Sequence, residues 1–269
     1  MFHVTQLMSE SNEGVVKVNA DVLTFVNGME KAGRLAAETL VYLGKKVRPG
    51  VTTNELDREA YEYIKSHGAE PAPLNYHGYP KSICTSVNHV ICHGVPDDTP
   101  LFEGDVINID VTVQLNGYFG DTSATFPVGK VSEKAQLISD IAEQAMFKGI
   151  EAIQPGAKTG DIGFAIQKFS TRKGYYPVED IGGHGIGTKF HDEPFVPSYG
   201  SKGKGIPLKT WRCITVEPML NETNAPMDEH VIPGSRIMYY TTSDKCLSAQ
   251  FEHTILITDT GHQILTLRD

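Results

Sequence analysis

The chain has 269 residues, of which 40% are hydrophobic, and its 33 acidic and 24 basic side chains give a formal net charge of −9. It is long enough to bury a large hydrophobic core, and its acidic balance argues against a nucleic-acid-binding protein. It contains no apolar run as long as a membrane helix, and its first residues lack the apolar centre of a signal peptide. Its four cysteines have no metal-binding or disulfide spacing, so we expect reduced thiols and a cytoplasmic location.

Two helices are predicted in the first quarter of the chain. Residues 21–45 place apolar side chains at helical spacing. A second helix is predicted over residues 52–68, because Thr52 and Glu55 match a capping box and Gly68 stands where helices commonly end.

The next predicted element is a β-hairpin over residues 106–126. Both arms are rich in β-branched and aromatic residues, and Asn116–Gly117 is a preferred hairpin turn. This turn places Asp121 opposite Thr112 and makes Asp110 a diagonal neighbour of Asp121 on the same face, about 7–8 Å away. Buried carboxylates that close repel each other, so a shared proton, a basic partner or a metal ion is needed. The alternative is an edge strand with solvated aspartates.

After the hairpin, a third helix that Ser132 can cap is predicted to run to about residue 151. A fourth is predicted over residues 159–174. From residue 181 onward, glycine-rich loops and short strands dominate, and the last strand lies within residues 251–258.

The chain contains an internal repeat, because residues 47–68 align with residues 153–174. At nearly the same offset, the strand that ends at Asp110 aligns with one that ends at Glu217. Two similar halves, each a helix pair plus a strand pair, are therefore expected to pack face to face. Such packing would bring together four acids, Asp110, Asp121, Glu217 and Glu252.

Four carboxylates in an apolar site cannot all stay ionised without cations. His93, His184 and His191 lie beside glycine or apolar residues and offer neutral nitrogen donors. A single histidine in a loop is usually only a polar surface group, but three beside this acid set favour a metal site. A carboxylate-rich ligand set with one imidazole is more typical of a site for Mn²⁺, Fe²⁺ or Co²⁺ than of a thiolate-type zinc site.

Six segments, in this order, resemble the type I methionine aminopeptidases of bacteria and organelles: PLNYHGYPKSICTSVNHVICHGVPDD, NIDVTV, GDTSATF, GHGIGTKFHDEP, TVEPML and SAQFEHT. The resemblance extends from about residue 27 to the C-terminus. It implies an α/β pita-bread fold, in which a pseudo-twofold pair of helix and antiparallel-strand halves surrounds a dinuclear metal site. We therefore expect residues 1–20 to be a flexible N-terminal extension and residues 21–269 to be one catalytic domain.

The resemblance also implies a role for individual residues. Two divalent ions (Mn, Fe or Co) would be held by Asp110, Asp121, His184, Glu217 and Glu252, with Asp121 and Glu252 bridging both ions and Asp110 serving only one. His93 and His191 would contact the substrate, His191 would stabilise the oxyanion, and Glu217 would carry a proton. The methionine pocket would be lined by Tyr76, Tyr79, Cys84, Phe190 and Met238. Asn88, Val90 and Ser248 would hold a monovalent cation.

The chain departs from the family pattern in two places. The segment 221–240 differs in length and sequence, with Met238 where a tryptophan is common, and Pro73 replaces a common pocket cysteine. These differences concern substrate range rather than chemistry.

The function that the resemblance implies is removal of the initiator methionine from nascent proteins and peptides when the second residue is small, by means of a metal-activated water. The partners would be a peptide N-terminus and, transiently, the ribosome, with no specific nucleic acid and no membrane, and we expect a monomer.

Three alternative functions would share part of this pattern. An Xaa-Pro peptidase would share the fold but generally carries a large additional N-terminal domain. A metal-free binding protein would be expected to have lost ligands. A hydrolase based on Cys92 and His93 is disfavoured, because adjacent residues in a strand point to opposite faces.

Overall fold

The structure is a computed structural model that describes residues 19–268. The helices agree with those predicted and are α1 (Ala20–Gly44), α2 (Thr53–Ser66), α3 (Glu133–Glu151) and α4 (Thr159–Arg172). Thr52 and Glu55 form the expected capping box of α2, and the Ser132 side chain accepts a hydrogen bond from the Ala135 N–H at the start of α3.

The strands are short except in the central hairpin. They are β1 (Glu70–Pro71), β2 (Cys84–Val87), β3 (Val90–Cys92), β4 (Val106–Leu115), β5 (Tyr118–Pro127), β6 (Tyr176–Pro177), β7 (Gly183–Ile186), β8 (Asp192–Val196), β9 (Cys213–Val216), β10 (Met219–Asn221), β11 (Met227–Val231), β12 (Met238–Thr242), β13 (Ser248–Gln250), β14 (His253–Ile257) and β15 (His262–Ile264). In one sheet β4 pairs with β1, β2 and β5, and the other sheets have the orders β13-β10-β6, β11-β12-β3 and β15-β14-β9-β7-β8.

The hairpin formed by β4 and β5 has the predicted register. Thr112 pairs with Asp121, and Asp110 pairs with Ser123. The turn residues Asn116 and Gly117 have φ angles of 52° and 84°, which is the left-handed conformation that a type I′ turn requires.

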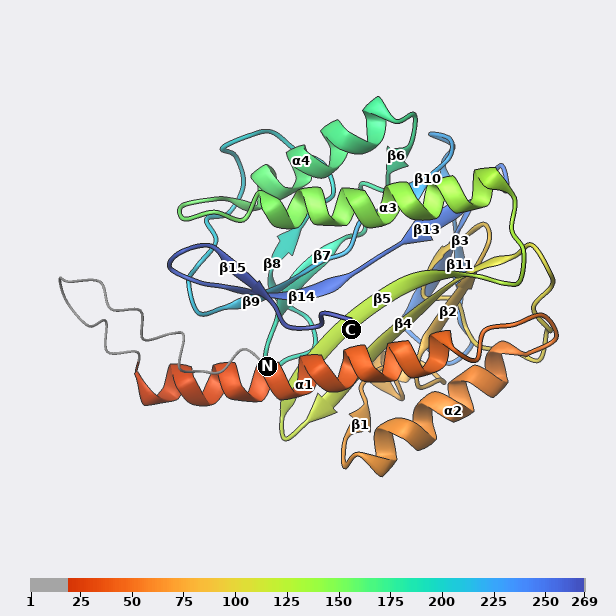
Figure 1. The fold of residues 1–269 in the computed structure, drawn as a ribbon, viewed down its shortest axis with the longest axis horizontal. Coiled ribbons are helices and arrows are strands. Elements are labelled where there is room, and N and C mark those ends of the chain that lie inside the picture. Colours follow the sequence, from red (N-terminus) through yellow and green to blue (C-terminus); the bar gives the residue numbers. More distant parts are fainter. Residues whose placement is uncertain (1–18, 269) are drawn as a thin grey trace.

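The internal repeat corresponds to two structurally similar halves. Pro71 of β1 pairs with Val113 of β4, and Pro177 of β6 pairs in the same way with Leu220 of β10. The helices α2 and α4 precede these equivalent strands. Figure 1 shows α1 and α2 along one side of the molecule, α3 and α4 along the opposite side, and the strands between the two helix pairs.

The main core joins the two halves. Buried aliphatic side chains of α1, α2, α3 and α4 pack with those of β4 and β9 in one continuous cluster. This packing fixes the strands that carry the acids relative to one another. Among the described residues, no helix is long and apolar enough to cross a membrane.

The predicted N-terminal extension falls largely on residues 1–18, which lie outside the described part of the chain. Asn19 caps α1, and Ala20 is its first residue, so these two residues belong to the helix. The division of the chain into an extension and one catalytic domain stays a prediction.

Candidate metal and substrate site

One cavity of about 220 Å³ brings together most of the residues that the sequence indicated. Its lining includes both halves of the chain and comprises Pro73, Tyr76, Tyr79, Cys84, His93, Asp110, Thr112, Asp121, Ile181, Gly182, His184, Phe190, His191, Glu217, Ile237 and Glu252. Polar and acidic groups therefore share the cavity with aromatic and aliphatic side chains.

The acids reach the cavity from corresponding strand pairs in the two halves. Asp110 and Asp121 come from the hairpin formed by β4 and β5. Val216 pairs with His253 and Met219 pairs with Gln250, so the intervening Glu217 and Glu252 lie opposite each other where these two ladders meet.

The two halves differ by one detail of register. Glu252 faces Glu217 directly, whereas the residue that faces Asp110 is Ser123, and Asp121 lies two positions away. Asp121 and Glu252 are thus approximate rather than exact counterparts in the repeat.

Burial makes the carboxylates difficult to ionise in the metal-free protein. Asp121 and Glu252 are only 4% and 2% exposed. Burial, reinforced by Glu217, raises the pKa of Asp110 to about 8. Burial also raises the pKa of Glu217 to about 7, and burial together with neighbouring acids raises the pKa of Asp121 and of Glu252.

His184 offers a nitrogen lone pair to these acids. Its Nδ1 lies 3.0 Å from the carbonyl oxygen of Gly185. Because a carbonyl oxygen only accepts, the ring hydrogen is on Nδ1 and Nε2 carries the lone pair. Burial lowers the pKa of His184 to about 4, so the ring is neutral. This Nε2 lies 3.7 Å from Asp121 Oδ2 and 3.6 Å from Glu217 Oε1.

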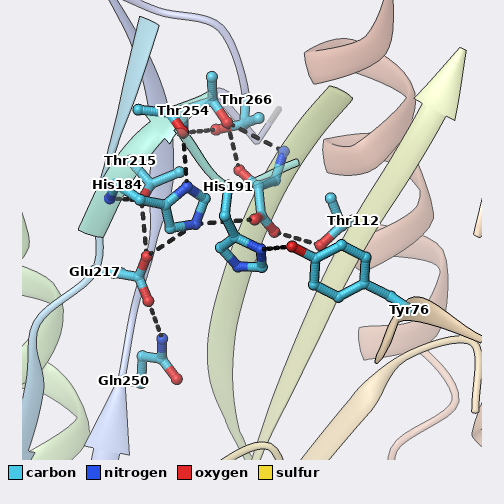
Figure 2. Close-up of polar contacts among 11 residues, drawn as sticks. Tyr76, Thr112, His184, His191, Thr215, Glu217, Gln250, Thr254 and Thr266 are labelled. Carbon is cyan, nitrogen blue, oxygen red and sulfur yellow. Dashed lines mark hydrogen bonds and ion pairs between the residues drawn. The ribbon is translucent and has the colours of Figure 1, made fainter. Parts of the chain in front are cut away.

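Neighbouring side chains orient the acids. The Thr112 hydroxyl donates to Asp121 Oδ1 at 2.7 Å, and the Thr215 hydroxyl donates to Glu217 Oε1 at 2.7 Å. The Gln250 amide donates to the other oxygen of Glu217 at 3.3 Å, and Figure 2 shows these contacts around the site. Sequence reasoning did not single out these three residues as site residues, although the hairpin register already placed Thr112 opposite Asp121.

The donor set fits a divalent metal ion. Ligand atoms of Asp121, His184 and Glu252 all lie within 4.8 Å of one another. Asp110 Oδ1 is buried and has no hydrogen-bond partner among the described residues. The carboxylates of Asp121 and Glu252 and the imidazole lone pair of His184 converge on one point, and the unpartnered oxygen of Asp110 lines the same cavity, so bound cations would satisfy these groups.

The ring of His191 packs beside that of His184 in the cavity lining. Its centroid lies 4.1 Å from that of Phe190 and 4.3 Å from that of His184. Its Nδ1 lies 2.9 Å from the hydroxyl of Tyr76 (Figure 2). Although the residue as a whole keeps solvent exposure, the removal of the ring from water lowers the pKa of His191 to about 3, and His184 contributes to this shift.

His93 is positioned by the segment that departs from the family pattern. Its Nδ1 donates to the carbonyl oxygen of Met238 at 3.0 Å. Met238 is not among the cavity-lining residues, whereas its neighbour Ile237 is. The sequence did not indicate Ile237, because the conformation of this segment is set by tertiary packing. The assignment of Met238 to the pocket rim stays a prediction.

The inner wall of the cavity is aromatic and apolar. Tyr79 is 1% exposed, and its hydroxyl donates to the carbonyl oxygen of Gly94 at 2.9 Å. Burial, followed by the charge of Asp110, raises the pKa of the Cys84 thiol, which keeps it protonated. Cys92 is buried in β3 and does not line the cavity, in contrast to His93. This arrangement does not form a nucleophile–base pair.

The residues expected to hold a monovalent cation lie outside this cavity. The Ser248 N–H donates to the carbonyl oxygen of Asn88 at 2.9 Å, so these two residues are in contact. The Ser248 hydroxyl is buried and has no hydrogen-bond partner among the described residues. Val90 lies nearby in β3, where it pairs with Thr241.

The chain is similar to known enzymes over most of its length. It is 52% identical over 239 residues to a methionine aminopeptidase from Rickettsia prowazekii, and the aligned region covers 89% of this chain and 91% of the relative. It is 44% identical over 249 residues to the methionine aminopeptidase of Escherichia coli K12, with 90% and 91% of the two chains covered.

Solved structures agree with this similarity. The crystal structure of methionine aminopeptidase from R. prowazekii superposes with a TM-score of 0.88 at 49% identity and covers 93% of this chain and 99% of that chain. A prolidase from Pyrococcus horikoshii shares the fold alone, with a TM-score of 0.71 at 23% identity over 91% of this chain and 62% of that chain. The predicted α/β pita-bread fold is therefore confirmed. The model of metallopeptidase family M24 matches residues 27–259, and the chain belongs to this family.

Proposed function

We propose that this protein is a metal-dependent aminopeptidase that removes the N-terminal methionine of proteins and peptides whose second residue is small. The observation that carries the proposal is the convergence of Asp121, His184 and Glu252 on one point in a cavity with aromatic walls. The methionine aminopeptidases of R. prowazekii and E. coli, which match nearly the whole chain, support the choice of substrate.

The metal complement proposed is two divalent ions, with Mn, Fe or Co as candidates. The residues that would hold them are Asp110, Asp121, His184, Glu217 and Glu252, all of which line the cavity. Bound divalent ions act as Lewis acids that polarise a carbonyl group and lower the pKa of water.

The histidines of the site have complementary roles in this proposal. His93 donates through Nδ1 to Met238, which leaves Nε2 as an acceptor for an N–H group of the substrate. His191 would donate through Nε2 to the substrate carbonyl oxygen as negative charge develops on it.

Glu217 is the proposed proton carrier. Its two carboxylate oxygens accept hydrogen bonds from Thr215 and Gln250, which hold the group in one orientation. Glu217 would accept a proton from the attacking water and pass it to the leaving amide nitrogen.

The substrate side chain would lie against the apolar wall. Tyr76, Tyr79, Cys84 and Phe190 line the cavity. Met238 would complete the rim, and the contact of its carbonyl oxygen with His93 supports this assignment. A flexible, unbranched thioether suits such a wall.

Further parts of the proposal concern ions, partners and location. Asn88, Val90 and Ser248 would hold a monovalent cation, and the buried, unpartnered Ser248 hydroxyl supports this assignment. The substrate would be a peptide or nascent-chain N-terminus, reached through a transient contact with the ribosome. We propose a monomer in the cytoplasm, without specific nucleic-acid or membrane binding.

Release of free methionine tests the function. The metal-loaded protein would be incubated with a Met-Gly peptide, with the N-acetylated form of that peptide and with an Xaa-Pro dipeptide. The proposal expects methionine release from the first substrate only, loss of activity with a chelator, and recovery after addition of Mn²⁺ or Co²⁺. Equal cleavage of the acetylated peptide, or full activity with a chelator, would contradict it.

A further inference from the structure

The turn between β11 and β12 contacts the loop that carries Tyr76. The main-chain N–H of Arg236 donates to the carbonyl oxygen of His77 at 2.9 Å, and the Ser235 hydroxyl donates to the same oxygen at 3.2 Å. The Arg236 guanidinium also lies 2.6 Å from His77 Nδ1. Because a guanidinium only donates, His77 Nδ1 is the acceptor, and three hydrogen bonds end on this one residue.

The loop that receives these hydrogen bonds has an unfavourable backbone conformation. Asn75 and His77 have φ angles of 65° and 48°, and Gly78 has a φ of 86°. Residues other than glycine rarely adopt this left-handed region, and such backbone conformations persist where surrounding contacts hold them. A Cβ atom on Gly78 would lie 2.4 Å from the carbonyl oxygen of Gly234, so the backbones of loop and turn are in direct contact.

Tyr76 lies between the two strained residues and reaches the site. Its hydroxyl lies 2.9 Å from His191 Nδ1, and its ring centroid lies 4.8 Å from that of Phe190. If the hydroxyl donates to Nδ1, the hydrogen of the neutral His191 ring must be on Nε2. That tautomer is the one able to donate to a substrate oxygen.

We propose that Arg236 is a positioning residue: its contact with His77 holds Tyr76 against Nδ1 of His191 and thereby keeps the His191 hydrogen on Nε2. The inference rests on the proposed function, because the oxyanion role of His191 belongs to that function. It assigns a structural role to part of the segment 221–240, in which the chain departs from the family pattern.

A double-mutant cycle tests whether Arg236 acts through the Tyr76 hydroxyl. The variants are Arg236→Ala, Tyr76→Phe and the double substitution, and kcat and KM are measured on a Met-Gly peptide with matched metal content. Tyr76→Phe should lower kcat about 10- to 100-fold, as is usual when a residue that orients a functional histidine is lost. Arg236→Ala should lower kcat about 3- to 10-fold, in proportion to the population of the competent loop conformation.

The decisive comparison is between the effect of Arg236→Ala on kcat in the wild type and its effect in the Tyr76→Phe variant. In the Tyr76→Phe background, Arg236→Ala should have almost no further effect on kcat, because the hydroxyl that it positions is gone. Arg236→Lys should restore part of the loss. Arg172→Ala, which removes an exposed arginine in α4, is the matched control and should behave like the wild type. The same fold-loss in both backgrounds, or no loss in the wild-type background, would overturn the proposal.

A measurement that needs no turnover separates this inference from the proposed function. In Zn²⁺-loaded protein, ¹⁵N chemical shifts of the His191 ring, assigned with His191→Ala, report the tautomer. The wild type should show hydrogen on Nε2, and Arg236→Ala should move both ring nitrogens toward a mixture; Ser235→Ala provides a second variant that weakens the same contact. Unchanged ring shifts in both variants would overturn the inference, whereas a wild type with these shifts but without methionine release would refute only the proposed function.

Discussion

Nε2 of His184 and Oδ2 of Asp121 lie 3.7 Å apart, although neither atom can donate a hydrogen bond to the other when the acid is ionised. The Nδ1 hydrogen of His184 is already used by Gly185, and burial lowers the pKa of the ring to about 4. When Asp121 is ionised, two electron-rich atoms are thus held side by side in a buried site. A cation between them removes this conflict, and the following predictions depend on that relationship.

The two aspartates of the hairpin should differ in their effect on metal binding. Asp121 is proposed to bridge two ions, whereas Asp110 serves one. Asp110→Asn should therefore retain one tightly bound ion with much weaker activity, and Asp121→Asn should weaken both ions and be nearly inactive. Calorimetric titration with Mn²⁺ or Co²⁺ measures both stoichiometries. Equal stoichiometry and affinity in the two variants would refute the bridging role.

The metal-free protein should lose stability as the pH rises from 6.5 to 8. Burial raises the pKa of Asp110 to about 8 and that of Glu217 to about 7, so the folded state holds protons that the unfolded chain has released. Stability falls with pH wherever the folded state binds more protons. The lowered pKa of His184 acts in the opposite direction, but only below its ordinary value of 6.5.

Thermal unfolding in the presence of a chelator measures this decrease in stability with rising pH. The melting temperature should be lower at pH 8 than at pH 6.5, and Asp110→Asn should flatten the difference, because it removes one of the raised carboxyl groups. Added metal should raise the melting temperature more at pH 8, since its ligands must be deprotonated. A metal-free protein that becomes more stable over this pH range would show that the acids are not protonated as inferred.

His191→Ala should impair catalysis without removing the metal. The ring lies against His184 but is proposed to act on the substrate oxygen rather than as a ligand. The loss of one oxyanion donor should lower kcat by roughly 10²–10³. Metal content and circular dichroism should match those of the wild type. Loss of metal in this variant would mean that His191 is a ligand.

The substrate range should follow from the apolar wall and the confined cavity. Met-Gly peptides should be cleaved much faster than Met-Phe peptides, and methionine should be preferred over leucine at the first position. Initial rates on a matched set of peptides measure both preferences. Comparable rates for Met-Gly and Met-Phe, or a preference for leucine, would contradict the proposed pocket.

Local signals in the sequence predicted much of the fold. Asn116 and Gly117 define the turn of the hairpin, and this turn fixes the strand register that places Asp121 opposite Thr112. The capping box at Thr52 and the aligned repeat predicted α2 and α4. These features depend on residues that are close in sequence or on a pattern that occurs twice.

Other parts of the site could not be derived in this way. The contact of Arg236 with His77 joins residues 159 positions apart and depends on how the β11–β12 turn packs. The same packing places Ile237 rather than Met238 among the cavity-lining residues. No periodicity or turn signal in residues 221–240 predicts which of these two residues lines the cavity, because contacts with the neighbouring loop determine it.

We propose that this site hydrolyses peptides by means of bound metal. The most direct measurement is metal analysis of anaerobically purified protein, paired with methionine release from a Met-Gly peptide by the same sample. We expect up to two divalent ions per chain, with activity that rises with metal content, disappears with chelator and returns with Mn²⁺, Fe²⁺ or Co²⁺. Activity that is independent of metal content, or metal-loaded protein that releases no methionine, would contradict it.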